Sequence, residues 1–410
     1  MSNYKFIGGW AVFWLIVIRM SIGWHLMYEG LWKVHTTSTA DPWTSAGYLR
    51  NSQGPLRQSF REMTGDPDET GWLDYDLMVA RWDDWLARFK AHHPDLTEDQ
   101  LKKLDLLVNG PKEFTAKLNQ MPAGVTIPKS LSEVVHFDTK RKLLVVNGEL
   151  HLTPRERETL LKLVEVKAEP ADDEKTENEH AREFHAAVTR LYQLSSRLSY
   201  KDQLTVALKR TASKDDEPAL DTRIENLSSN FGSIQLYRQE AFELYPEKIK
   251  RYESALAHAE QDFQYDHLDK MGTDLQQLRA KLVGPIKALT KQMQRDAEQL
   301  LTPEQLARGA VPEPWTRLRF VDASTMWGLV ILGGLLIAGL FSRLSAFAAA
   351  VMLTMFYLAM PPWPGVPQPP GPQHAFIINQ HLIEVLVLLF LAMIPTGKWF
   401  GMDALFGRSR

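Results

Sequence analysis

The stretch from Arg19 to Lys33, RMSIGWHLMYEGLWK, decides the fold because it places ionisable side chains within an apolar segment of membrane-spanning length. Successive residues of an α-helix are turned by about 100°, so His25, Glu29 and Lys33 share one face of the helix. Arg19 lies on the same side. A charged side chain near the middle of a bilayer costs roughly 2.5 to 3.5 kcal/mol on insertion scales, so this polar stripe is expected to face protein.

Apolar residues concentrate at the two ends of the chain. Residues 7–31, 322–342, 344–360 and 376–394 are strongly apolar, and about 20 such residues are enough to cross a bilayer as a helix. The first segment is too long and too charged for the short apolar core of a cleaved signal peptide. The sequence therefore predicts an all-α membrane protein with a bundle of four transmembrane helices.

These spans divide the chain into three parts. Residues 1–60 hold the first span and its loop, residues 61–320 form a large insertion, and residues 321–410 hold three further spans and a tail. No Lys or Arg occurs between Leu344 and Gly397, which predicts that the loop joining the third and fourth spans is extracytoplasmic. Both termini are then cytoplasmic, and the insertion is extracytoplasmic.

The insertion is predicted to be soluble and mainly helical. Residues 74–92 carry apolar side chains at helical spacing, and we expect Trp82 and Trp85 in a hydrophobic core. At three helix starts a Thr side chain can cap the backbone three residues on, while a Glu or Gln there reaches back. These starts are Thr97 with Gln100, Thr153 with Glu156, and Thr302 with Gln305. Two β-rich runs in residues 133–150 predict one small β-hairpin.

Long helices are expected near the end of the insertion. Apolar residues recur mainly at steps of three and four between Ile249 and Met293, which is typical of long antiparallel helices packed along a seam. Gly284–Pro285 is expected to break or kink the second helix. No nucleotide loop, catalytic triad or clustered metal motif appears there. We therefore expect the insertion to bind a protein partner or a second copy of the chain, and we expect no nucleic acid and no metal.

The fourth apolar segment supplies a second polar stripe, formed by Gln380, His381 and Glu384. At 1.5 Å per residue, this stripe lies at about the depth of His25. We expect Arg19 to pair with Glu384 across the first and fourth spans. The cluster has two interpretations: buried ion pairs that fix the helix register, or a substrate or proton-relay site.

As a site, this cluster would suit a lipid-soluble quinone, because His and Glu exchange the protons that quinone reduction requires. The candidate catalytic residues are Arg19, His25, Glu29, His381 and Glu384. The candidate quinone-binding residues are Trp24, Tyr28, Trp32, Lys33 and Gln380. The chain has no Cys, which excludes disulfides and thiol nucleophiles on it.

Two separated motifs resemble the DoxX family of four-span bacterial membrane proteins. GWHLMYEGLWK, followed by PWTSAGYL and GPL, is similar to that family's first span and loop. NQHLIEVLVLLFLAMIPTGKWFGMDALF is similar to its fourth span and its Gly-Lys-Trp-x-Gly-x-Asp tail. The insertion is a departure, since ordinary members have a short connection there.

The resemblance implies a bacterial cytoplasmic membrane. Through the related DoxD subunit, it also implies a membrane thiosulfate:quinone oxidoreductase, which oxidises thiosulfate to tetrathionate with a second subunit. The alternative is a non-catalytic membrane anchor or scaffold whose helical insertion binds a partner, and the size of the insertion favours this alternative.

Overall fold

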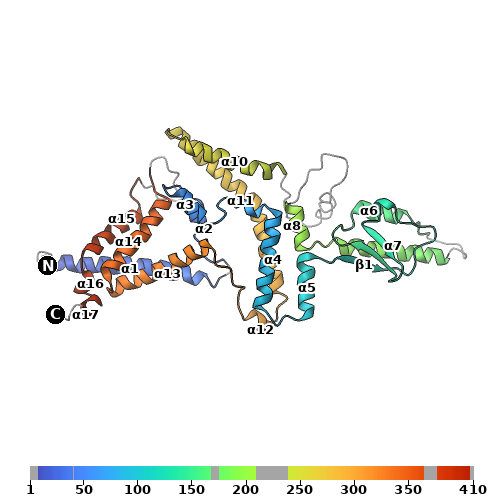
Figure 1. The fold of residues 1–410 in the computed structure, drawn as a ribbon, viewed down its shortest axis with the longest axis horizontal. Coiled ribbons are helices and arrows are strands. Elements are labelled where there is room, and N and C mark those ends of the chain that lie inside the picture. Colours follow the sequence, from blue (N-terminus) through green and yellow to red (C-terminus); the bar gives the residue numbers. More distant parts are fainter. Residues whose placement is uncertain (1–7, 40, 168–174, 209–238, 364–375, 407–410) are drawn as a thin grey trace. The chain divides into compact units, whose positions relative to one another are not determined.

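The computed structural model describes residues 8–39, 41–167, 175–208, 239–363 and 376–406, and most of these residues are helical (Figure 1). The chain separates into two compact units. The first contains residues 1–68, 252–273 and 313–410, and the second contains residues 69–251 and 274–312. Most of the proline-rich loop between the third and fourth apolar segments lies at residues 364–375, outside the described residues.

Three helices of the first unit are long and apolar enough to cross a membrane, as expected for a membrane protein. They are α1 (Gly9–Thr36), α13 (Arg317–Ala338) and α14 (Ser342–Ala359). A fourth apolar helix, α15 (Gln380–Met393), has 14 residues. It is shorter than its apolar segment because Asn379 caps its start, accepting a hydrogen bond from the Leu382 N–H. The unit also contains the short helices α2 (Ala46–Arg50), α3 (Arg57–Glu62), α16 (Thr396–Trp399) and α17 (Asp403–Phe406).

The four apolar helices share one hydrophobic cluster, with Leu26, Leu336, Leu353 and Leu388 among its members. Glycines bring α1 and α13 into close contact. A Cβ atom built on Gly23 would lie 2.9 Å from the carbonyl oxygen of Gly333. Helices in lipid associate through such small residues, because packing there takes the place of the hydrophobic drive.

The C-terminal tail folds back onto the turn between α13 and α14. The Asp403 carboxylate accepts hydrogen bonds from the backbone N–H groups of Phe341 and Ser342, at 2.7 and 2.9 Å. It also accepts one from the Ser342 hydroxyl at 2.6 Å. A carboxylate that bonds the free N–H groups at a helix start stabilises that helix, so Asp403 joins the tail to α14.

The second unit has a helical core built on α4 (Tyr75–His92). Its Trp82 and Trp85 are buried, as the sequence predicts. The indole N–H of Trp82 donates to the Thr290 hydroxyl at 3.0 Å, so α11 (Asp262–Glu298) packs against α4. The second unit also includes η1 (Thr70–Trp72), α5 (Glu98–Asn109), α8 (Tyr200–Leu208) and α12 (Pro303–Leu306). Helix α10 (Gln239–Ala257) belongs to it up to Arg251, and residues 252–273, which hold the end of α10 and the start of α11, belong to the first unit.

The sequence predicts a break or a kink at Gly284–Pro285; helix α11 continues through Pro285, so the helix does not break there. Proline removes one backbone hydrogen bond and crowds the preceding turn. The burial of Ile286, Leu289 and Met293 directly after it offsets this cost and keeps the chain helical.

All three predicted capping boxes are confirmed. In each, the Thr side chain accepts from the backbone N–H three residues on, and the Glu or Gln side chain there accepts from the Thr backbone N–H. The boxes begin α5, α6 (Pro154–Lys162) and α12.

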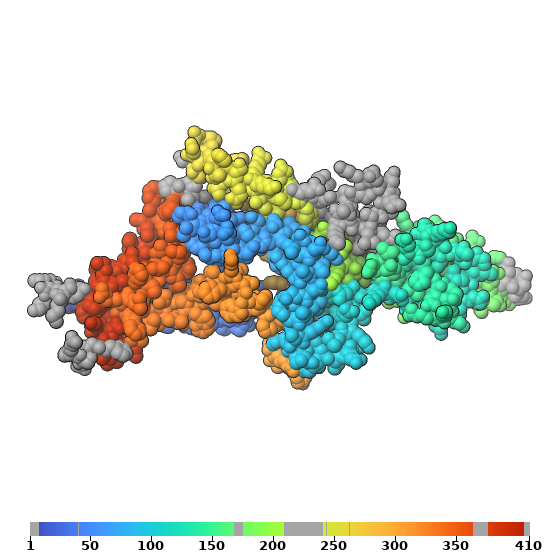
Figure 2. All heavy atoms as spheres, in the orientation of Figure 1, coloured from blue at the N-terminus to red at the C-terminus, as the bar shows by residue number. Residues whose placement is uncertain are grey.

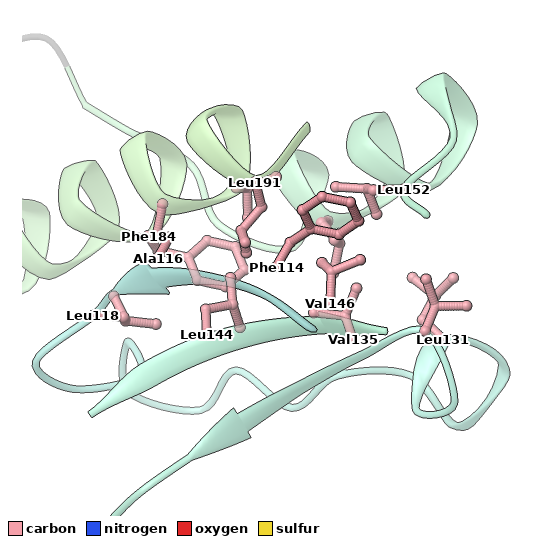
Figure 3. Packing of buried hydrophobic residues seen from close by; sticks show 14 residues of the cluster. Phe114, Ala116, Leu118, Leu131, Val135, Leu144, Val146, Leu152, Phe184 and Leu191 are labelled. Atoms are coloured by element: carbon pink, nitrogen blue, oxygen red, sulfur yellow. The ribbon is translucent and has the colours of Figure 1, made fainter. Parts of the chain in front are cut away.

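A small antiparallel sheet forms the other part of the second unit. The predicted hairpin is confirmed as β2 (Val135–Asp138) paired with β3 (Leu143–Asn147). The sequence did not predict β1 (Glu113–Lys117), which pairs with the other edge of β3 in the order β1-β3-β2. Figure 3 shows α7 (Lys175–Ser195) covering one face of this sheet, with Phe184 and Leu191 directed at Phe114 and Leu144.

Candidate functional site

A cavity of about 640 Å³ lies within the first unit, between the four apolar helices and residues 43–63. We call residues 43–63 the cover segment. Apolar side chains make up much of the cavity wall, as in most small-molecule sites. They include Leu26 of α1, Leu329 of α13, Met352, Leu353 and Phe356 of α14, and Leu49, Phe60 and Met63 of the cover segment.

His25, Gln380 and Glu384 meet in the wall of this cavity. His25 Nε2 lies 3.5 Å from Glu384 Oε1, and the Gln380 amide nitrogen donates to the same oxygen at 3.0 Å. The two predicted polar stripes, on α1 and α15, therefore come together. The Glu384 side chain is 15% exposed and the His25 side chain 44%, so His25 is the member of the pair more open to a ligand.

Glu29 and Lys33 form a second ion pair in the cavity wall. Lys33 Nζ lies 2.5 Å from Glu29 Oε2, across the i, i+4 spacing that favours such pairs on a helix. The ammonium group also lies 5.4 Å from the centre of the Trp43 ring, within cation–π range. Glu29 therefore balances the charge of Lys33 within α1, and the Trp43 ring keeps the ammonium group beside the cover segment.

His381 also lines the cavity. Its ring meets the edge of the Phe356 ring, with 6.2 Å between the ring centres. Its Nδ1 atom is buried and has no hydrogen-bond partner among the described residues. A ligand in the cavity would supply that partner.

Three predicted aromatic residues are not in the cavity wall. Trp24, Tyr28 and Trp32 are 58%, 56% and 50% exposed, and Trp24 stacks on Tyr28 instead. At about 100° per residue they fall on the face of α1 opposite Gly23, Leu26 and Gly30, which are buried against the bundle. Trp43 and Tyr48 of the cover segment are the aromatic residues that line this part of the cavity.

Arg19 is fully buried, but the predicted pair with Glu384 is wrong. Its Nη2 donates to the carbonyl oxygen of Phe400 at 2.7 Å, and Asp403 is the carboxylate that acts on it electrostatically. The tail after α15 turns back toward α1. The prediction compared the depths of residues along straight helices, so it could not account for this reversal. Arg19 therefore belongs to the tail contact and not to the cavity.

Asp322 is a buried carboxylate that sequence reasoning missed. It accepts hydrogen bonds from the Thr44 hydroxyl at 2.8 Å, the Ser45 backbone N–H at 2.8 Å and the Ser45 hydroxyl. These bonds fix the start of the cover segment to α13. A lone Asp at the edge of an apolar segment was the signal that could have identified it.

Tyr48 attaches the cover segment to α14. Its hydroxyl donates to the Phe356 carbonyl oxygen at 2.5 Å. Burial raises the pKa of Tyr48 to about 12, so the phenol stays protonated and remains a donor at neutral pH.

No family model, curated protein or solved structure matches this chain. Functional inference therefore begins from the cavity and from the sequence motifs. The cavity combines a broad apolar wall with two histidines, two carboxylates and a lysine, which is the composition of a site for an amphiphilic molecule.

Proposed function

We propose that this chain is a DoxX-like integral membrane protein whose helical bundle binds a lipid-soluble quinone. The cavity carries the proposal, because its apolar wall and its polar residues match the apolar tail and the carbonyl oxygens of a quinone. Its volume of about 640 Å³ falls within the range of roughly 300 to 1,000 Å³ that is common for small-molecule sites.

The polar residues offer hydrogen bonds and protons to such a ligand. His381, whose Nδ1 atom is buried and unpaired among the described residues, suits one quinone oxygen. Reduction of a quinone takes two electrons and two protons. His25 beside Glu384 is placed to pass on a proton, since imidazole and carboxyl groups serve as general acids and bases.

The DoxX resemblance suggests the electron donor for this reaction. Two thiosulfate ions would each lose one electron and join as tetrathionate on a second subunit. These two electrons, together with two protons taken up from water, would reduce the quinone to its quinol. In this proposal the chain is the quinone-linked membrane subunit of an oxidoreductase.

The proposal includes a membrane arrangement. With α15 as a fourth span, the absence of Lys and Arg between Leu344 and Gly397 places that connection outside. Both termini are then on the cytoplasmic side of a bacterial inner membrane. Residues 37–316, between α1 and α13, are extracytoplasmic.

Titration with a short-chain ubiquinone tests the function. Purified protein in nanodiscs should bind it saturably, with quenching of tryptophan fluorescence. Glu384→Gln and His25→Ala should each weaken binding roughly tenfold, the loss expected for one hydrogen bond in a low-dielectric site. Glu113→Gln, on the exposed edge strand β1, is the matched control and should bind normally. Absence of saturable binding by the unmodified protein would reject the proposal.

A second candidate is a membrane anchor whose insertion binds a partner. It is favoured by the second unit, which holds hydrophobic clusters of its own, among them one around Val146 and one around Trp82. In that case the polar cluster is structural. Replacing both His25 and Glu384 by Leu would then leave the thermal stability near that of the unmodified protein, and quinone would not bind.

A further inference from the structure

The cover segment is fixed to the end of α14. The Ser52 hydroxyl donates to the Ala359 carbonyl oxygen at 2.7 Å, and the backbone N–H of Gln53 donates to the same oxygen at 3.0 Å. A Cβ atom on Gly54 would lie 1.7 Å from the Leu358 carbonyl oxygen, so the chain passes directly over the helix there. This half of the cover segment has little freedom to move.

The other half of the cover segment is held by the insertion. Arg57, at the start of α3, forms a two-pronged ion pair with Glu253 of α10, with nitrogen–oxygen distances of 2.9 and 2.7 Å. The Arg57 guanidinium lies 5.9 Å from the centre of the Tyr252 ring, and the Gln53 amide donates to the Tyr252 hydroxyl at 3.3 Å. In Figure 2 the blue cover segment lies against the yellow helical segment that carries these residues.

Helix α3 thus contacts both the insertion and the cavity within one helical turn. Arg57 engages Glu253, whereas Phe60, three residues later, is buried and lines the cavity together with Met63. Glu253 and Tyr252 belong to the same compact unit as the cover segment and the cavity. The position of this cavity wall therefore depends on a side chain that the insertion supplies.

We propose that the insertion controls access to the bundle cavity, with Glu253 as the positioning residue that holds α3 and its Phe60 wall in place. This assigns the insertion a role at the cavity itself, apart from any partner it binds. The identity of the ligand rests on the proposed function; the control of access does not.

Cysteine accessibility tests this directly, because the native chain has no Cys. Thr325 lines the cavity, so Thr325→Cys provides a reporter whose alkylation by a small maleimide measures entry. In that background Glu253→Gln should raise the alkylation rate roughly threefold to tenfold, the range expected for loss of a partly exposed, two-pronged ion pair. Glu113→Gln removes an exposed carboxylate that pairs with Arg141 on the sheet and should leave the rate unchanged.

Charge reversal tests whether the Arg57–Glu253 ion pair itself controls access, or whether any destabilising substitution near α3 raises the alkylation rate. Arg57→Glu alone should raise the rate, and Arg57→Glu with Glu253→Arg should restore it toward that of the reporter protein. The same variants are then titrated with short-chain ubiquinone. Equal alkylation rates in the Glu253→Gln and Glu113→Gln proteins would overturn the inference, as would a charge reversal that fails to restore the rate.

The two proposals fail in different ways. If ubiquinone binds but Glu253→Gln leaves the alkylation rate unchanged, the control of access is rejected while the quinone site stands. If the alkylation rate rises as expected but neither the unmodified protein nor its variants bind ubiquinone, the control of access stands and the ligand assignment is rejected.

Discussion

Asp322 accepts a hydrogen bond from the backbone N–H of Ser45, 277 residues earlier in the chain, and so ties the start of the cover segment to a membrane-length helix. Asp322 is 9% exposed, and its carboxylate accepts three hydrogen bonds, two from hydroxyl groups and one from a backbone N–H. The bond links the cavity wall to the bundle.

Asp322→Asn should therefore destabilise the full-length protein. The amide has the shape of the carboxylate, but it presents N–H groups to the Thr44 and Ser45 donors and leaves one of them unpaired. Leaving a buried donor unpaired costs about 1 to 3 kcal/mol, and thermal unfolding in detergent would measure it. Glu179→Gln, at an exposed position of α7, should have no such effect.

Asp403→Ala should lower stability by roughly 1 to 3 kcal/mol, because it leaves the backbone N–H groups at the start of α14 without their acceptor and removes the carboxylate that attracts buried Arg19. Arg19→Leu together with Asp403→Ala should cost less than the sum of the two single changes, since the electrostatic attraction between the two groups is lost only once. Strictly additive changes in the free energy of unfolding would show that the two residues do not interact.

His93 should make the second unit acid-sensitive. It is 1% exposed and its ring lies 4.8 Å from that of His92. Burial, together with the charges of His92 and Arg308, lowers the pKa of His93. Because the unfolded state then binds more protons, stability is fully present above the unfolded pKa of about 6.5 and falls as the pH drops below it.

Denaturant unfolding from about pH 7.5 down to about pH 5, on either side of the unfolded histidine pKa, would measure this loss. His93→Phe keeps a ring against Phe89 and should flatten the pH dependence. His136→Gln, at an exposed site on β2, should leave it steep. An unchanged slope in His93→Phe would contradict the assignment.

Residues 69–312 should fold without the membrane helices, since the second unit buries its own clusters. The fragment should be soluble, with a helix-dominated circular dichroism spectrum and cooperative unfolding. Trp82→Ala should cost about 3 to 5 kcal/mol, as for other large buried aromatic residues. Leu77→Ala on the same helix, at a side chain 52% exposed, should cost little. A disordered spectrum would mean that the fragment needs the rest of the chain.

The membrane orientation can be tested by single-cysteine labelling of intact cells. A cysteine in place of exposed Lys102 on α5 should react with a membrane-impermeant maleimide from outside. One in place of Arg343, in the turn that begins α14, should react only after the membrane is opened. The opposite pattern would invert the proposed topology.

Features set by neighbouring residues could be predicted from the sequence. The capping boxes at Thr97, Thr153 and Thr302 each involve side chains within three residues, and the hairpin joins two adjacent runs. The similar depth of His25 and the Glu384 stripe could also be predicted, because both lie on regular apolar helices, but the predicted partner of Glu384 was Arg19 and the structure has His25 there.

Features set by distant contacts could not be predicted. The partner of Arg19 depends on a chain reversal after α15 that brings Phe400 back to α1. Strand β1 has only two buried side chains, Phe114 and Ala116, and is stabilised mainly by pairing with β3. Leu77 fits the apolar period of α4 yet is exposed. Periodicity identifies the apolar face of a helix, but it does not show how much of that face the neighbouring elements cover.

The close glycine contact between α1 and α13 has a consequence for how the protein is made. Gly23 can meet Gly333 only after residues 37–316 have been synthesised, which takes roughly a quarter of a minute to a minute at 5 to 20 residues per second. Until then Arg19 of α1 lacks its contact with Phe400 of the tail, and His25 lacks Glu384 of α15. Each residue added to the insertion would lengthen this interval in proportion, so the length of the insertion sets how long α1 waits for its partners.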